Sequence, residues 1–118
     1  MGASFKDLIV WKRAIQLSIE VYRLTASFPK SELFGLVSQM RRASVSIASN
    51  IAEVYGRRTR GEYLQFLGHA RGSNCELQTQ LVIAAALGLG EKSLHDCVDT
   101  LSADVSRLLL AIMNKLKA

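Results

Sequence analysis

The sequence predicts an all-α protein, an up-down-up-down antiparallel bundle of four long helices. Apolar residues recur at steps of three and four along four separate segments, which is the spacing of one helix face. No segment shows the alternation typical of a strand, and only short turn signals separate the four segments. Helices joined by short connections pack antiparallel, and 118 residues suffice for one core, so residues 1–118 form a single predicted domain.

The first two helices are predicted from their apolar spacing and their ends. The first runs from Asp7 to Ser27, where Phe28-Pro29 stops it. The second begins after Ser31, a suitable N-cap, and ends at Tyr55-Gly56, where Gly56 supplies a left-handed C-terminal residue. The apolar positions of the first helix are Leu8, Trp11, Ile15, Ile19 and Tyr22.

The third helix is predicted from Thr59 to Gly88, and the fourth follows the Gly88-Leu89-Gly90 turn. Thr59 and Glu62 have the spacing of a capping box, in which Glu62 returns to the N–H of the cap residue. Gly68 and Gly72 lie inside the third helix, so we expect close contact with a neighbouring helix there. The fourth helix has the cleanest amphipathic pattern, formed by Leu94, Val98, Leu101, Val105, Leu108, Ile112 and Leu116.

The second helix carries a continuous apolar seam with one amide in it. The seam consists of Leu36, Met40, Ala43, Ile47, Asn50 and Val54. Two interpretations of Asn50 stay open. Its amide either sits at the edge of the seam and bonds to solvent or nearby backbone, or is buried and fixes the register of the helices.

A second stripe on the same helix is small and nearly uncharged, whereas a helix with one buried side should be charged opposite it. We therefore predict that both sides pack, either within the fold or between subunits, which favours a homo-oligomer. Glu53 and Arg57 are spaced to pair along the helix. The candidate structural or oligomer residues are Ser38, Val45, Ser49, Asn50, Ala52 and Glu53.

The charge is uneven, with a formal net charge of +5. Residues 1–60 hold ten Lys/Arg and four Asp/Glu, or +6, and residues 61–118 hold five and six, or −1. The predicted topology gathers one basic end of the bundle, with Lys6, Arg57, Arg58, Arg60, Lys115 and Lys117 against Asp7 and Glu62. A basic surface of this kind suggests a polyanionic partner.

Nucleic acid is the first partner hypothesis, because the arginines of the connection between the second and third helices lie beside Tyr55 and Tyr63. Guanidinium groups bind phosphates and aromatic rings stack on bases. The alternative is that these arginines only solubilise a helix end. The candidate nucleic-acid-binding residues are Lys12, Arg13, Arg41, Arg42, Arg57, Arg58 and Arg60.

Catalysis and metal binding are not indicated. His69 has no thiol or carboxylate near it in sequence, and His95 precedes Asp96 and Cys97, which point in other directions on a helix. No Cys/His cluster has metal-ligand spacing and no phosphate-binding glycine motif is present, so we expect no enzyme, no metal and no cofactor.

The remaining sequence signals concern thiols and location. Cys75 and Cys97 are offset by roughly 10 Å on the predicted bundle, too far for a disulfide, and are expected to be small buried hydrophobes. No uncharged apolar run reaches about 18 residues and the first residues lack a secretory pattern, so we expect a cytoplasmic protein that does not enter membranes.

The chain resembles the bacterial four-helix-bundle proteins encoded in 23S ribosomal RNA intervening sequences. The resemblance rests on Trp11, Phe28-Pro29, Gln39-Met40-Arg41-Arg42, Ser49-Asn50-Ile51-Ala52-Glu53 and Arg71-Gly72-Ser73, and it weakens in the fourth helix. It implies an antiparallel four-helix bundle assembled as a homopentamer. The family often has Pro at the position of Ala48 and Gly at that of Val54, so the second helix should be straighter here.

A similar protein, the accessory variability determinant of diversity-generating retroelements, is a basic pentamer that works with a reverse transcriptase and nucleic acid. Together the residues and the resemblance predict a non-enzymatic pentamer that binds nucleic acid, RNA above all, without strong sequence choice. The alternative is an oligomeric scaffold that recruits a protein partner, such as a reverse transcriptase, with its charge incidental.

Overall fold

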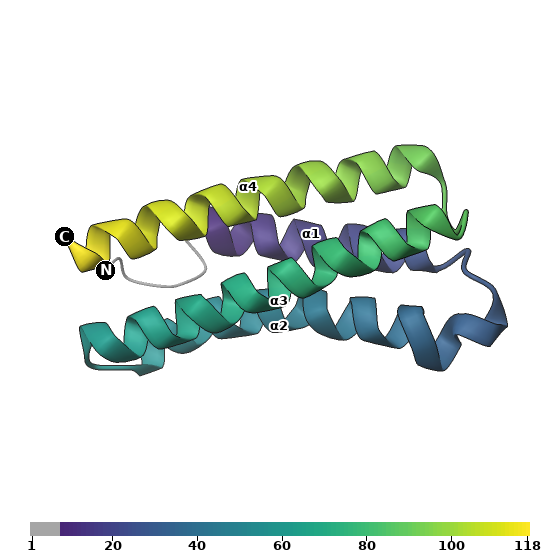
Figure 1. The fold of residues 1–118 in the computed structure, drawn as a ribbon. Coiled ribbons are helices and arrows are strands. Elements are labelled where there is room, and N and C mark those ends of the chain that lie inside the picture. Colours follow the sequence, from purple (N-terminus) through teal and green to yellow (C-terminus); the bar gives the residue numbers. More distant parts are fainter. Residues whose placement is uncertain (1–7) are drawn as a thin grey trace.

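The computed structural model describes residues 8–118, and its helices form the predicted antiparallel four-helix bundle (Figure 1). The helices are α1 (Ile9–Thr25), α2 (Ser38–Glu53), α3 (Arg60–Ala86) and α4 (Lys92–Lys117). No strand occurs between residues 8 and 118. α1 packs against α2 and α4, and α3 packs against the same two helices, so each helix has two neighbours around one core.

The core is aliphatic and follows the predicted seam on α2, but on α1 the buried face lies one position away from the prediction. Ile19 and Tyr22 of α1 are 47% and 45% exposed, because the helix is rotated so that its aliphatic row faces the core: Val10, Ala14, Leu17, Val21 and Leu24. On α2, Met40, Ala43, Ile47 and Val54 of the seam are buried, while Leu36 and Asn50 are half-buried. Asn50 donates from Nδ2 to the backbone oxygen of Ser46 at 2.9 Å and to its Oγ at 3.0 Å. The edge interpretation of Asn50 is therefore correct, since its partners are local and it does not set the register between helices.

The amide buried between helices is Asn74. Asn74 of α3 is fully buried, donates to the backbone oxygen of Ser102 on α4 at 2.9 Å, and accepts from the Ser102 hydroxyl at 2.7 Å. Gln78 Nε2 donates to the same hydroxyl at 2.9 Å. These three side chains hold α3 against α4 through hydrogen bonds, which the spacing of apolar residues in the sequence does not predict.

The start of the second helical segment differs from the prediction. Ser31 does not cap an α-helix. Instead a 3₁₀ turn, η2 (Lys30–Glu32), and a π-type turn, η3 (Leu33–Val37), precede α2. The carboxylate of Glu32 accepts from the Leu36 N–H at 3.2 Å, and Gly35 breaks the helix with φ −104° and ψ −113°. Ala48 lies inside uninterrupted α-helix, as predicted, whereas at Val54 the α-helix gives way to a 3₁₀ turn, so the predicted continuity holds at the first position and not at the second.

The end of α1 and the roles of three glycines also differ from the prediction. α1 ends at Thr25 rather than Ser27. Gly56 is not left-handed, because α2 tightens into the 3₁₀ turn η4 (Val54–Gly56), and positive φ within residues 8–118 occurs only at Gly88 and Gly90. A Cβ at Gly68 or Gly72 would meet nothing within 4 Å, so the expected close helix contact is absent inside the subunit.

The two cysteines are free, as predicted, but they are not buried. Cys75 and Cys97 are both exposed. Each lies next to the buried stripe of its helix rather than on it, beside Asn74 and Val98 respectively, and a shift of one helical position is enough to expose a side chain.

Candidate nucleic-acid interface

The fold places one cationic group at a single end of the bundle. Figure 1 shows the connection between α2 and α3 at the same end as the C-terminus of α4. The opposite end holds the α1–α2 and α3–α4 connections. Lys6 and Asp7 lie outside the described residues. The basic end therefore consists of Arg57, Arg58, Arg60, Lys115 and Lys117, with Glu53 and Glu62 beside them.

Arg57 is held by contacts within the subunit. Its Nη2 donates to Glu53 Oε2 at 2.7 Å, which confirms the predicted pair, and its guanidinium lies 4.3 Å from the centre of the Phe66 ring. The Nε atom is buried without a hydrogen-bond partner. Arg57 therefore holds the connection against α3, and only part of its guanidinium faces outward.

Arg58 and Arg60 are exposed on either side of a capped helix start. Thr59 Oγ1 accepts from the Glu62 N–H at 3.1 Å, as predicted. The Glu62 carboxylate accepts from the Thr59 hydroxyl at 3.1 Å and from the Arg58 N–H at 3.5 Å, so it returns one residue earlier than predicted. The capping box fixes the backbone that carries the two arginines, and the positive end of the α3 dipole lies beside them.

The neighbouring tyrosines are less open than the sequence suggested. Tyr55 and Tyr63 are both half-buried, and Tyr63 packs against the hydrophobic core. A base could therefore contact only the exposed edge of either ring, unless the tyrosine side chain moves. The exposed cations are the part of the predicted site that is accessible to nucleic acid.

Arg41 and Arg42 form a second basic group along α2. The Arg41 guanidinium lies 4.5 Å from the Tyr22 ring centre, and its Nε donates to Thr25 Oγ1 at 2.9 Å, so Arg41 ties α2 to α1. Arg42 is exposed, and no ion pair involves it within the described part of the chain. Fifteen residues separate Arg42 from Arg57, which is about 22 Å along a helix, so the two groups do not converge on one phosphate.

Lys12 and Arg13 lie on α1 between these groups. Both are exposed, and Arg13 Nη1 donates to Gln16 Oε1 at 3.1 Å. The adjacent Trp11 lines a shallow groove with Ser49 and Ala52, which places this pair beside the C-terminal part of α2.

The predicted oligomer stripe borders the same groove. Val45 is 44% exposed, Ser49 is exposed, and Ser38 and Ala52 are half-buried. The groove has a volume of about 290 Å³, and α1 contributes Trp11, Ile15 and Ser18 to it. An apolar valine and small side chains thus face outward where a lone subunit would normally carry charge.

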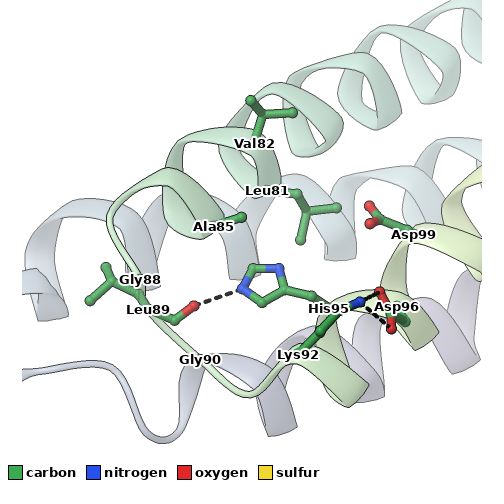
Figure 2. A pocket seen from close by; sticks show the side chains of 10 residues that line it. All are labelled: Leu81, Val82, Ala85, Gly88, Leu89, Gly90, Lys92, His95, Asp96 and Asp99. Carbon is green, nitrogen blue, oxygen red and sulfur yellow. Dashed lines mark hydrogen bonds and ion pairs between the residues drawn. The ribbon is translucent and has the colours of Figure 1, made fainter.

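Between residues 8 and 118 no three His, Cys, Asp or Glu side chains are grouped to hold a metal ion. His95 is buried, and its Nε2 lies 2.6 Å from the Leu89 backbone oxygen, a bond that closes the α3–α4 turn (Figure 2). No helix in this region has the length and apolar character to cross a membrane.

One exposed residue escaped the sequence analysis. Phe34 is 91% exposed and lies in the π-type turn before α2, at the end opposite the basic residues. The sequence gives one indication of this exposure, which is that Phe34 does not belong to the apolar seam. The exposure was not predicted because a regular helix was expected from residue 31 onward.

Comparison with known proteins gives a family and a fold. The family model described as 23S rRNA-intervening sequence protein matches residues 6–111. No curated protein matches the sequence significantly. A similar solved structure is the crystal structure, at 1.70 Å, of a protein of unknown function from the S23 ribosomal protein family of Bacteroides thetaiotaomicron VPI-5482. It is 18% identical, with a TM-score of 0.79 over 89% of this chain and 98% of that chain.

Proposed function

Since this chain belongs to the family of 23S rRNA-intervening sequence proteins, we propose that it is a non-enzymatic homo-oligomer, a pentamer, that binds RNA through its basic surface. The contacts are to phosphates, and they discriminate little between base sequences. The observation that carries the proposal is the pair of exposed arginines, Arg58 and Arg60, on a capped connection at the same end of the bundle as the last turn of α4, which carries Lys115 and Lys117.

Assembly is what makes such a small patch effective. The five cations of the basic end face two carboxylates, Glu53 and Glu62, so one subunit offers about three net positive charges there. Cyclic symmetry repeats this patch once in each subunit. Several weak contacts on one RNA strand then act together, because each further contact forms at a high effective concentration.

The family name and the structural neighbour's description mention no enzymatic activity. The arrangement of side chains agrees with a binding role, since the cations point outward and the titratable groups of the interior, such as His95, are engaged in helix packing. Phosphate contacts fix position without reading bases, which supports weak sequence preference.

The test is the salt dependence of RNA affinity for the wild type and for Arg58→Glu/Arg60→Glu. Each phosphate contact to a single strand contributes about 0.7 to the slope of log K against log salt, so the double variant should lower the slope by about 1.4 for each subunit that contacts the strand. Its affinity should also fall at every salt concentration. Fluorescence anisotropy with a labelled single-stranded RNA of mixed sequence measures both quantities.

The matched control is Arg23→Glu/Lys30→Glu. It changes the net charge equally at exposed positions toward the opposite end of the bundle. The control should retain the wild-type slope. If the control and the Arg58/Arg60 variant lose affinity equally, the basic end is not the site. If wild-type binding is absent or independent of salt, the scaffold alternative replaces RNA binding.

A further inference from the structure

The exposed Phe34 is a candidate for contact with a partner outside its own subunit. At 91% exposure it is the most exposed large apolar side chain between residues 8 and 118, and Leu33 beside it is 49% exposed. Gly35 adopts non-helical angles immediately after it, so the backbone departs from the helix at this point. An exposed aromatic side chain of this kind is typical of an anchor at a protein interface.

A matching cavity lies at the same end of the bundle, between α3 and α4 (Figure 2). Its volume is about 450 Å³, and Leu81, Val82, Ala85 and Leu89 supply apolar walls. Val82 is 70% exposed at its rim. The carboxylates of Asp96 and Asp99 border the α4 side. Asp96 already pairs with Lys92 at 3.1 Å, whereas Asp99 has no ion pair in the described region.

The charges on the two surfaces are complementary. Arg42 is exposed and has no ion pair in the described chain, and it follows Phe34 on the same segment. If the outer faces of α2 from two copies met around a twofold axis close to Arg42, the Arg42 side chains of the two copies would approach each other, which is unfavourable. Contact between the α2 side of one copy and the α3/α4 side of the next instead brings Arg42 toward Asp99.

The directions of the helices also agree. Arg42 follows Phe34 along the chain toward the basic end, and on α4 Asp99 lies farther toward that end than Lys92, which also lines the cavity. α2 and α4 run in the same direction in Figure 1. Two parallel copies side by side therefore place Phe34 at the cavity with Arg42 on its Asp99 side.

We propose that Phe34 of one subunit docks in the cavity of a second copy, lined by Leu81, Val82, Ala85 and Leu89, while Arg42 pairs with Asp99 of that copy. The proposal rests on the self-assembly in the proposed function and specifies which faces meet. Because the two faces differ, the contact is heterologous, and the closed oligomer of the proposed function requires that its rotation close into a ring. Parallel subunits then carry all their basic ends on one rim of the ring.

The test uses two surface variants, Phe34→Asp and Val82→Asp, whose oligomers are measured by native mass spectrometry. Each variant alone removes one half of every contact, so both should be monomers. Mixed together, they retain one intact contact, Phe34 of the Val82→Asp chain in the cavity of the Phe34→Asp chain. The mixture should therefore yield 1:1 dimers and nothing larger.

A charge exchange tests the polar pair independently. Arg42→Glu should shift the wild-type oligomer toward monomer by at least tenfold in dissociation constant, and Arg42→Glu/Asp99→Arg should restore most of the loss. Ile9→Asp, at a position that is 64% exposed near the other end of the bundle, is the matched control and should leave the oligomer unchanged. Circular dichroism of each variant verifies that it is folded.

The outcomes separate this proposal from the proposed function. A wild-type monomer overturns self-assembly, and with it both proposals. A wild-type oligomer that Phe34→Asp and Val82→Asp leave intact overturns only the choice of faces. A wild-type oligomer that stops at two subunits indicates a twofold contact and also overturns the heterologous arrangement.

Discussion

At the scale of single residues, the polar side chains fall into those that hold helices together and those that face outward. Asn74, Ser102 and Arg41 bridge between helices, while Arg58 and Arg42 are exposed. A cation that is stacked and hydrogen-bonded, such as Arg57, contributes to the fold. The exposed arginines contribute little to stability, which leaves them available for binding.

Replacing Asn74 should destabilise the protein more than replacing Asn50. Asn74→Ala removes both bonds to Ser102 and leaves a gap between α3 and α4, so we expect a loss of about 1–3 kcal/mol in the free energy of unfolding. Asn50→Ala, the matched control, loses only local bonds to Ser46 and should cost less than about 1 kcal/mol. Urea denaturation measures both, and equal losses would contradict the role given to Asn74.

At the scale of elements, the connections decide how the four helices align. The α3–α4 turn is the tightest of them, because Gly88 and Gly90 both have positive φ, 72° and 83°. A Cβ at Gly90 would lie 2.5 Å from Leu24 Cδ1 and 3.0 Å from the Phe28 ring, whereas one at Gly88 meets open space. Gly90 thus lets the turn approach α1 closely.

Gly90→Ala should therefore be much more costly than Gly88→Ala. Both substitutions place alanine in the left-handed region, at about 1–2 kcal/mol each. Gly90→Ala adds a clash with core side chains, a further 1–3 kcal/mol or so. Thermal unfolding of the two variants tests this difference, and a Gly90→Ala protein as stable as Gly88→Ala would show that the turn is not packed as described.

The sequence was sufficient to predict that all four helices exist, although on α1 it placed the buried face one position away, at Trp11 and Ile15 instead of Val10 and Ala14. The seam of α2, the pattern of α4 and the Thr59 cap each follow from spacing alone. Spacing failed where a single contact overrides it. Glu32 provides the cap that was expected from Ser31. The π-type turn with its break at Gly35 is not predicted by the spacing of apolar residues.

The candidate site was only partly predictable for a related reason. Sequence places Arg57, Arg58 and Arg60 on one connection but does not distinguish them, because the Phe66 ring that engages Arg57 belongs to the next helix. The exposure of Cys75 and Phe34 depends on rotation of each helix about its axis, and one position of error exchanges buried for exposed.

At the scale of the whole molecule, the bundle has different ends and different sides. One end gathers the exposed cations, and the other carries Phe34 and the cavity between α3 and α4. In the proposed ring, side contacts join the subunits and leave the basic ends on one rim. The proposed RNA affinity then depends on assembly, since each separate patch is weak.

Sedimentation velocity of the wild type with a labelled single-stranded RNA tests this account most directly. At low salt the RNA should sediment with a species of five subunits. Raising the salt should release the RNA while the protein remains assembled, because the phosphate contacts all weaken with salt, whereas the docking of Phe34 is apolar and only the Arg42–Asp99 pair of the subunit contact is screened. RNA that sediments with a single subunit, or that stays bound at high salt, would contradict the account.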